Sequence, residues 1–247
     1  MSLVSAQDLR LAYGDKLIQQ GLNFAVQQGE VLVIVGGSGC GKSTLLRALI
    51  GLQVPAAGQV LYGDTNFYQA DDSAQNQLRR QFGVMFQAGA LWSAMSVGEN
   101  VMLPLEMFSP LGPEERRERA LAKLGLVGLA EQFDAEPSAL SGGQRKRAAI
   151  ARALALEPAL LYLDEPSAGL DPLTSANLDE LIQQLSHELG TTIVMVSHEL
   201  ASIFAVAQRL LFLDAEQKTM TALDSPQALL DHGPDAVQRF LRRGQAR

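Results

Sequence analysis

Residues 31–50 join three local patterns in an order that restricts the fold more than any other part of the chain. Val31–Val35 is apolar throughout, which is typical of a strand buried on both faces. The loop Gly36–Ser43 matches GxxxxGK followed by Ser or Thr, and residues 43–50 have helical residue types that stop at Gly51. Backbone amides in such a loop can surround a phosphate, because glycines let the chain approach closely. The pattern predicts an α/β protein that holds a nucleotide where a buried strand ends.

Each part of the glycine loop suits a different group of a bound nucleotide. The loop N–H groups are expected around the β-phosphate, where the following helix adds its positive end. We expect Lys42 to reach the β- and γ-phosphates and the Ser43 hydroxyl to coordinate Mg²⁺. Cys40 is interpreted as a small residue that fits the loop, with alkylation beside bound phosphate as a hypothesis. The residues expected to contact the nucleotide here are Gly36, Gly37, Ser38, Gly39, Cys40, Gly41, Lys42 and Ser43.

Strand-like and helix-like segments follow one another along the rest of the chain. The first 35 residues read as strands, which predicts a β-rich segment before the glycine loop. Asp71–Ser73 reads as a polar loop before the apolar stretch at 82–86. Residues 97–137 have a helical pattern. We therefore expect an inserted helical subdomain in the middle of the chain.

Strand–helix alternation resumes with apolar runs at 160–163, 191–196 and 210–213. Such alternation favours a mostly parallel sheet. Asp164 ends the first run, so its carboxylate is expected at the carboxyl edge of the sheet, where ligands of open α/β folds collect. There it can hold a metal ion, directly or through water. The alternative is that Asp164 and Glu165 only begin a loop.

The segment Leu140–Gln144 is a second candidate anion site. Ser141 is expected to begin a helix whose exposed N–H groups suit a γ-phosphate. A simple helix cap is the alternative, but it does not account for Gly142 and Gly143, which would let the nucleotide of another chain approach. We interpret the cluster Arg145–Arg147 as a solvated helix face, because the net charge of −7 argues against a nucleic-acid partner.

Together, the glycine loop and Leu140–Gln144 resemble the nucleotide-binding subunits of ABC transporters, and the resemblance extends to about residue 215. It implies ATP and Mg²⁺ as cofactors. It also implies that Leu140–Gln144 of one subunit closes over the ATP of a second, so that the active enzyme is a homodimer. Glu165 is then the general base that polarises the attacking water, and His198 contacts the γ-phosphate and Glu165. The alternative for His198 is a purely structural role, which is common for a histidine that follows a strand.

The same resemblance assigns roles to four more side chains. Gln87 contacts Mg²⁺ and water and relays the nucleotide state to a membrane subunit. Tyr13 lies under adenine, where a flat ring can stack, and Thr44 touches the α-phosphate. Asp171 couples the two sites across the subunit interface. Ser141, Gly142, Gly143, Gln144 and Asp171 complete the expected nucleotide site, and Mg²⁺ is expected on Ser43, Gln87 and Asp164.

The resemblance implies a P-loop NTPase fold with a mostly parallel core sheet, an N-terminal antiparallel β-subdomain and the inserted helical subdomain. The ABC ATPase domain is expected over residues 1–215, with the insertion at about 97–140, and a C-terminal helical extension over 216–247. The extension carries a basic end, which either docks on the domain or contacts a partner or anionic lipid. Its arginines are Arg239, Arg242, Arg243 and Arg247.

The residues around Gln87 bear on the choice of transporter. The stretches 83–92 and 96–105 are similar to the Mla-type ATPases that power phospholipid transport with Mce-domain proteins. This resemblance implies that the chain works with an integral membrane permease at the cytoplasmic face of the inner membrane. An Mce-domain protein and a small accessory subunit are further partners that it suggests. Gln144 departs from the methionine of many Mla-type subunits, and Ser167–Asp171 reads like ABC importers generally. Lipoprotein release and small-solute import therefore stay open.

Two interpretations from other classes fit the sequence less well. A soluble ABC ATPase acting on DNA or ribosomes usually has two cassettes or a long coiled-coil insertion, and neither fits in 247 residues. The acidic net charge is also wrong for a nucleic-acid partner. A small-molecule kinase with the same phosphate loop leaves Leu140–Gln144 and His198 unexplained. Because no apolar run reaches roughly 18 residues, a membrane role is expected to depend on a partner.

Overall fold

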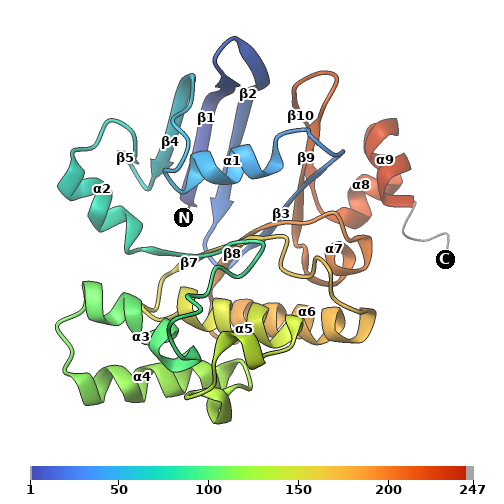
Figure 1. Cartoon of the computed structure of the whole chain (residues 1–247). Helices are drawn as coiled ribbons and strands as arrows, with labels where there is room; N and C mark the ends of the chain where they lie inside the picture. The colour runs from blue at the N-terminus through green and yellow to red at the C-terminus, as the bar shows by residue number, and fades with distance from the viewer. Residues whose placement is uncertain (1, 243–247) are drawn as a thin grey trace.

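The computed structural model describes residues 2–242, which form two β-sheets with helices around them (Figure 1). The larger sheet has six strands in the order β10-β9-β3-β8-β7-β6. Its neighbouring strands pair in parallel, except that β10 is antiparallel to β9, so the expected mostly parallel sheet is confirmed. The strands are β3 Val31–Gly36, β6 Phe82–Met85, β7 Leu160–Asp164, β8 Thr192–Val196, β9 Arg209–Asp214 and β10 Thr219–Asp224.

The smaller sheet is antiparallel and has the strand order β2-β1-β4-β5. Its strands are β1 Ser2–Tyr13, β2 Lys16–Gln27, β4 Ala57–Tyr62 and β5 Thr65–Asn66. Inward side chains such as Leu9 share one buried cluster with helix α1 (Lys42–Leu49) and one face of the larger sheet. Side chains of β3 alternate between faces, so Leu32 joins this cluster and Val33 joins the one on the opposite face. Helix α1 is therefore held between the two sheets (Figure 1).

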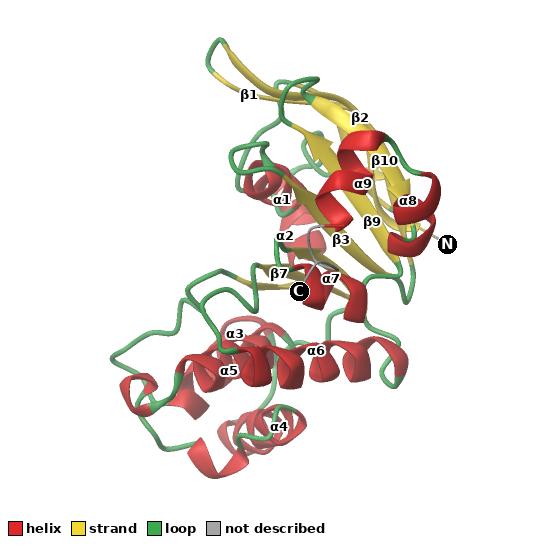
Figure 2. Ribbon diagram, turned by 90° about the vertical axis from the view of Figure 1, so that its right-hand side faces the viewer, coloured by secondary structure: helices red, strands yellow, loops and turns green. Residues whose placement is uncertain are grey.

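The second buried cluster joins the opposite face of the larger sheet to a layer of helices, which lies below the sheets in Figure 2. The helices are α3 Val97–Phe108, α4 Pro113–Leu126, α5 Gly142–Ala153, α6 Pro172–His187 and α7 Leu200–Val206. Helix α3 begins at a capping box, in which the side chains of Ser96 and Glu99 accept from each other's backbone N–H groups. Two 3₁₀ turns, Ala130–Gln132 and Pro137–Ala139, lie between α4 and α5. The helical pattern expected for residues 97–137 is confirmed.

Two expectations about secondary structure were wrong. Asp71–Ser73 is not a loop but the start of helix α2 (Asp72–Arg79), because the Asp71 carboxylate accepts from the Ala74 N–H at 2.8 Å and caps the helix. The segment after residue 215 is not helical throughout, because β10 adds a strand to the edge of the larger sheet beside β9. The inward packing of Leu223 from β10 against the first cluster supplies apolar contact there.

Helices α8 (Pro226–His232) and α9 (Asp235–Arg242) end the described part of the chain. Val237 and Leu241 of α9 are buried against the second cluster, so α9 docks on its own domain. Arg239 and Arg242 lie on α9, whereas Arg243 and Arg247 lie outside the described residues. Within residues 2–242, no helix combines the length and the apolar character needed to span a bilayer.

Candidate nucleotide-binding site

The glycine loop leaves the carboxyl end of β3 in a conformation that larger residues resist. Gly36 has φ 148°, and a Cβ there would lie 2.4 Å from the Leu213 carbonyl oxygen of the neighbouring strand β9. Gly41 has φ 100° and precedes α1 without a side-chain cap, so the first N–H groups of that helix face the loop. The Lys42 ammonium donates to the carbonyls of Gly36 at 3.0 Å and Gly37 at 3.2 Å, which holds it across the loop. The geometry is that of an anion cradle at a helix N-terminus.

A pocket of about 380 Å³ opens beside this loop. Tyr13, at the end of β1, lies on its wall with 44% of its surface exposed, and its hydroxyl is 3.5 Å from the Thr44 Oγ1. An exposed ring next to a phosphate cradle can stack on a planar base. The residues that line the pocket are Tyr13, Lys16, Ile18, Ser38, Gly39, Gly41, Lys42, Ser43, Thr44 and Glu165. Most of the residues predicted from the loop, with Tyr13, Thr44 and Glu165, therefore meet in one place.

Cys40 does not point into this pocket. It is 2% exposed, and a Cβ added to Gly36 would lie 2.6 Å from its sulfur, so the thiol fills space behind the loop. Burial raises the pKa of Cys40, and the nearby Lys42 charge opposes this shift. A buried thiol with a raised pKa is a poor nucleophile. The hypothesis of an alkylation-sensitive thiol beside the phosphate therefore disagrees with the structure.

Asp164, at the carboxyl end of β7, has a buried carboxylate oxygen without a hydrogen-bond partner among the described residues. Burial raises the pKa of Asp164, and the neighbouring Glu165 raises it further. A buried, unpartnered carboxylate oxygen is costly unless it has a cation beside it. A negatively charged carboxylate oxygen is a suitable ligand for Mg²⁺ or a similar hard cation. The Ser43 hydroxyl is also an oxygen ligand and suits the same ion.

Glu165 is held by groups from two other loops. The Gln87 side-chain amide donates to its Oε2 at 3.0 Å, and the His198 Nδ1 lies 3.1 Å from its Oε1. The backbone of Glu165 has φ 47°, a left-handed conformation that is uncommon outside glycine, and its N–H donates to the Val196 carbonyl of β8 at 3.0 Å. The structure thus brings Gln87, Glu165 and His198 together at one edge of the sheet, as predicted. A carboxylate fixed by such bonds can orient and deprotonate a water molecule.

Ser141 begins helix α5 and forms a capping box with Gln144. The Gln144 N–H donates to the Ser141 hydroxyl at 3.2 Å, and the Ser141 N–H donates to the Gln144 side-chain oxygen at 2.9 Å. A Cβ at Gly143 would lie 2.3 Å from the Thr174 Cγ2, whereas Gly142 has more room. Packing on α6 of the same chain therefore gives a separate reason for glycine at 143, whereas Gly142 is not restricted in this way.

The structure does not bring Ser141–Gln144 to the glycine-loop pocket. Ser141, Gly143 and Gln144 line a separate pocket of about 340 Å³, which shares no residue with the first. Asp171 belongs to the second region, where it caps α6 by accepting from the Leu173 and Thr174 N–H groups at 3.1 and 3.0 Å. Bonds from Thr174 lower the pKa of Asp171. The chain thus carries two separate sets of predicted nucleotide residues.

Lys146 of α5 was wrongly grouped with its neighbours as a solvated face. It is 8% exposed, and its ammonium donates to the Gln87 carbonyl and, at 3.3 Å, to the Glu165 carbonyl. Burial lowers the pKa of Lys146, while the charge of Glu165 opposes the shift. One side chain thus ties the backbones of two predicted site residues together. The signal in the sequence was helical spacing, since Lys146 lies on the same face of α5 as Gly143 and Ile150, which are buried.

We predict that Lys146→Met lowers the kcat of ATP hydrolysis about tenfold and leaves ATP binding by the isolated chain unchanged. The reason is that methionine keeps the volume but loses charged hydrogen bonds, each of which contributes about 1.5–3 kcal/mol. Lys146→Gln is the matched variant, because its amide can still donate to a carbonyl, and we expect it to retain more activity. Initial rates over a range of ATP concentrations separate kcat from KM. A Lys146→Met enzyme with the parental kcat would refute the positioning role.

The glycine loop at the end of a parallel strand and the carboxylates at the same sheet edge define a nucleotide-binding protein of the P-loop class. Comparison with protein families gives a match over residues 19–168 to the family described as ABC transporter. The chain belongs to this family and is an ATPase of the ABC type, and its relatives are named as ATP-binding proteins. The resemblance found in the sequence is confirmed.

Two kinds of named relatives are similarly close. The methionine import ATP-binding protein MetN of Rhizobium johnstonii is 38% identical over 92% of this chain. The intermembrane phospholipid transport system ATP-binding protein MlaF of Escherichia coli K12 is 36% identical over 97% of this chain and 88% of its own length. The chain spans only 64% of that MetN and 58% of the MetN of Mesorhizobium japonicum.

Solved structures agree with the fold. The ATP-binding cassette MJ0796, in a dimeric post-hydrolysis state bound to ADP and Pi, has a TM-score of 0.80 and 32% identity. The match covers 90% of this chain and 98% of that one. The protein cbiO1 of Clostridium perfringens, part of the ABC transporter complex cbiONQ, has a TM-score of 0.85 and 28% identity, with 99% and 98% covered.

Proposed function

We propose that the chain is the ATP-hydrolysing motor subunit of a membrane ABC transporter, in which two copies close over two ATP molecules and drive a separate permease. The observation that carries the proposal is the separation of the two pockets. The glycine-loop pocket has a base and a phosphate cradle, whereas Ser141 and Gly143 line another pocket that shares none of its residues. A head-to-tail pair of chains would place each Ser141 pocket over the glycine loop of the other. The solved dimer of the similar cassette MJ0796 supports this arrangement.

In the proposed reaction, each residue near the glycine loop has a separate task. The loop amides and Lys42 hold the β- and γ-phosphates, and Tyr13 stacks on adenine. Glu165 accepts a proton from the attacking water, which His198 and Gln87 help to position through their bonds to its carboxylate. Ser43, Gln87 and Asp164 would hold Mg²⁺, which supplies positive charge for the phosphate oxygens when it is bound.

The second set of residues completes the site of the other copy. The free N–H groups at the start of α5, with the Ser141 hydroxyl, suit the γ-phosphate of the opposite nucleotide. Gln144 fixes the conformation of Ser141 through the capping box, and Gly142 leaves room for the approach. Asp171 lies at the start of α6 and accepts from the N–H of Thr174, which lines the Ser141 pocket. Asp171 would face the other subunit.

The permease is proposed to dock around Gln87. Phe86 and Trp92 flank this residue and expose large apolar surfaces, with Trp92 61% exposed. The side chain of buried Asn100 accepts from the Trp92 N–H at 2.7 Å and donates to its carbonyl at 3.0 Å, so the exposed ring has a fixed base. Exposed aromatic residues on a rigid base are typical of protein interfaces. This contact would place the chain at the cytoplasmic face of the inner membrane.

Phospholipid or a related lipid is the cargo we favour, with an Mce-domain protein and a small accessory subunit as further partners. The near-complete mutual coverage with the phospholipid-transport protein MlaF supports this choice. Import of a small solute such as methionine is the second candidate, because MetN proteins are as similar in sequence over the part that aligns. The pockets described above within residues 2–242 are not assigned to cargo, so identifying the partners in the complex is what distinguishes the two candidates.

The test is to purify the tagged chain with its membrane partners in mild detergent, identify them by mass spectrometry and extract bound lipids. We expect a permease that co-purifies with phospholipid, and ATP hydrolysis that phospholipid changes and methionine does not. Trp92→Ala should reduce permease recovery several-fold without changing ATP affinity, while the exposed Leu189→Ala serves as the matched control. A methionine permease as the partner, with hydrolysis that responds to methionine, would overturn the lipid proposal.

A further inference from the structure

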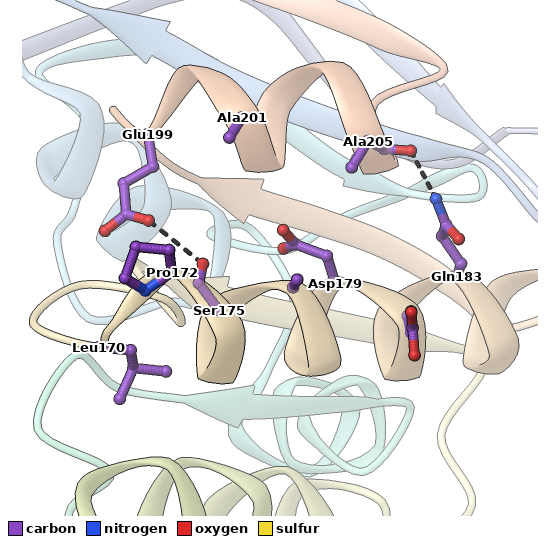
Figure 3. Close-up of a pocket in the computed structure, with 10 residues that line it drawn as sticks. Leu170, Pro172, Ser175, Asp179, Gln183, Glu199, Ala201 and Ala205 are labelled. Carbon is purple, nitrogen blue, oxygen red and sulfur yellow. Dashed lines mark hydrogen bonds between the residues drawn. The ribbon is translucent and has the colours of Figure 1, made fainter.

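A groove of about 530 Å³ lies between helices α6 and α7, away from both pockets of the nucleotide site (Figure 3). One end is formed by Leu170 and Pro172, at the start of α6. Ala201 and Ala205 form an apolar wall on α7, and their small side chains leave the space open. The groove shares no lining residue with the glycine-loop pocket or the Ser141 pocket.

Asp179 points from α6 into this groove (Figure 3). It is 6% exposed, and its buried Oδ1 has no hydrogen-bond partner among residues 2–242. Burial raises the pKa of Asp179 to about 6, against a bond from Ser202 that lowers it, and the neighbouring Glu199 raises it further. Burial therefore makes the charged form of Asp179 costly unless a partner compensates it. A buried carboxylate with an empty acceptor position is costly without a donor.

The other charged groups of the groove are also acidic. Glu180 and Glu199 line it together with Asp179, and its lining contains no lysine, arginine or histidine. The Ser175 hydroxyl donates to Glu199 at 3.4 Å, which is a weak bond and leaves the charge of Glu199 uncompensated. Lys146 interacts electrostatically with Glu199, but the Lys146 ammonium is already bonded to the carbonyls of Gln87 and Glu165. Residues 2–242 thus place no counter-ion among the groove's lining side chains.

We propose that the groove binds a small primary alkylammonium ion. The ammonium group carries three N–H donors, so it can bond to the Asp179 carboxylate from the side that lines the groove and also to the Glu199 carboxylate. The alkyl chain would lie on Ala201, Ala205 and Leu170, which gives it apolar surface to cover. A bare inorganic cation would match the charge but leave this wall exposed. The ligand therefore combines a single positive end with a short apolar chain.

The position of the groove links it to segments near the nucleotide. Helix α6 begins directly after Asp171, and α7 begins after Glu199, next to His198. The Gln183 amide already donates across the groove from α6 to the Ala205 carbonyl of α7 at 2.7 Å. A bound amine would add a second bridge between the two helices, from Asp179 in the middle of α6 to Glu199 at the start of α7. The site itself exists in one chain without nucleotide, permease or cargo.

The proposal is tested by titrating butylammonium chloride into the ATP-free chain, with binding followed by calorimetry and by amide NMR shifts. Butanol is the uncharged control of equal length. We expect saturable binding of butylammonium with shifts confined to α6 and α7, and no saturable binding of butanol. Asp179→Asn should weaken binding at least tenfold, whereas Asp72→Asn, an equal charge change at an exposed position on α2, should bind as the parent does.

Asparagine has nearly the shape of aspartate and removes a buried charge, so thermal unfolding of Asp179→Asn should occur at the parental temperature or above it. Ala201→Phe provides a second variant, which keeps Asp179 but fills the groove, and it should also lose binding. Equal affinity of Asp179→Asn and the parent, or a linear response without saturation up to high millimolar amine, would overturn the proposal. Because the titration contains no nucleotide, these results are independent of the proposed transport function.

Discussion

Glu165→Gln is expected to lower steady-state ATP hydrolysis by at least a hundredfold while ATP binding is retained. The physical reason is that glutamine keeps the shape of the side chain but cannot accept a proton from water, and general-base catalysis typically contributes 10²–10⁴-fold. Gln87 and His198 contact the two carboxylate oxygens, so the change leaves the surrounding loops in place. Phosphate release measures turnover, and size-exclusion chromatography with ATP should show an accumulated dimer, because closure is no longer followed by hydrolysis.

Glu131→Gln is the matched control, since Glu131 is an exposed residue of the first 3₁₀ turn. It should hydrolyse ATP like the parent and show no trapped dimer. If Glu165→Gln turns over at the parental rate, Glu165 is not the base. If it loses turnover but also loses ATP affinity, the carboxylate acts in nucleotide binding rather than in proton transfer.

Ser141→Arg is expected to reduce hydrolysis by more than a hundredfold while each isolated chain still binds ATP. The arginine would remove the cap of α5 and fill the pocket proposed to receive the γ-phosphate of the other copy. The glycine-loop pocket does not include Ser141, so nucleotide affinity of the monomer should stay within about twofold of the parent. Fluorescent-nucleotide titration and phosphate release separate the two effects.

A mixing experiment makes this prediction sharper. Lys42→Ala alone should also be inactive, because the lysine that spans the glycine loop is lost. In a mixed dimer, however, the intact glycine loop of the Ser141→Arg chain meets the intact Ser141 of the Lys42→Ala chain. Hydrolysis should therefore recover in part when the two inactive variants are combined. No recovery in a mixture that forms dimers would argue that both residues must act within one chain.

Local patterns predicted the elements whose geometry depends on neighbours in the sequence. The glycine loop needs only a strand before it and a helix after it, and Asp164 reaches the sheet edge because it ends an apolar strand. Strand β10 and helix α2 were missed for a related reason. The β10 sequence has weak alternation and gains its stability from β9, while the short α2 depends on the single cap at Asp71.

The missed parts of the site depend on contacts between distant segments. Lys146 is buried because the backbones of Gln87 and Glu165 converge on it from other elements, which its basic neighbours in the sequence conceal. Gly143 faces Thr174 across two helices, and no pattern within residues 140–144 encodes that approach. The sequence does not show that a buried acceptor such as the Asp164 Oδ1 lacks a hydrogen-bond partner, because this depends on the positions of all its neighbours in the fold.

In the proposed closed pair, helix α5 would connect the two ATP molecules by a short path. Its first residues would touch the nucleotide of the opposite chain, and Lys146, about 8 Å further along a rigid helix, holds the backbone of the Glu165 that serves the chain's own nucleotide. In the proposed pair, a shift of α5 on binding one nucleotide would be passed through Lys146 to the backbone of Glu165 at the other site. This coupling would act through one helix, and both sites would then become ready for hydrolysis together.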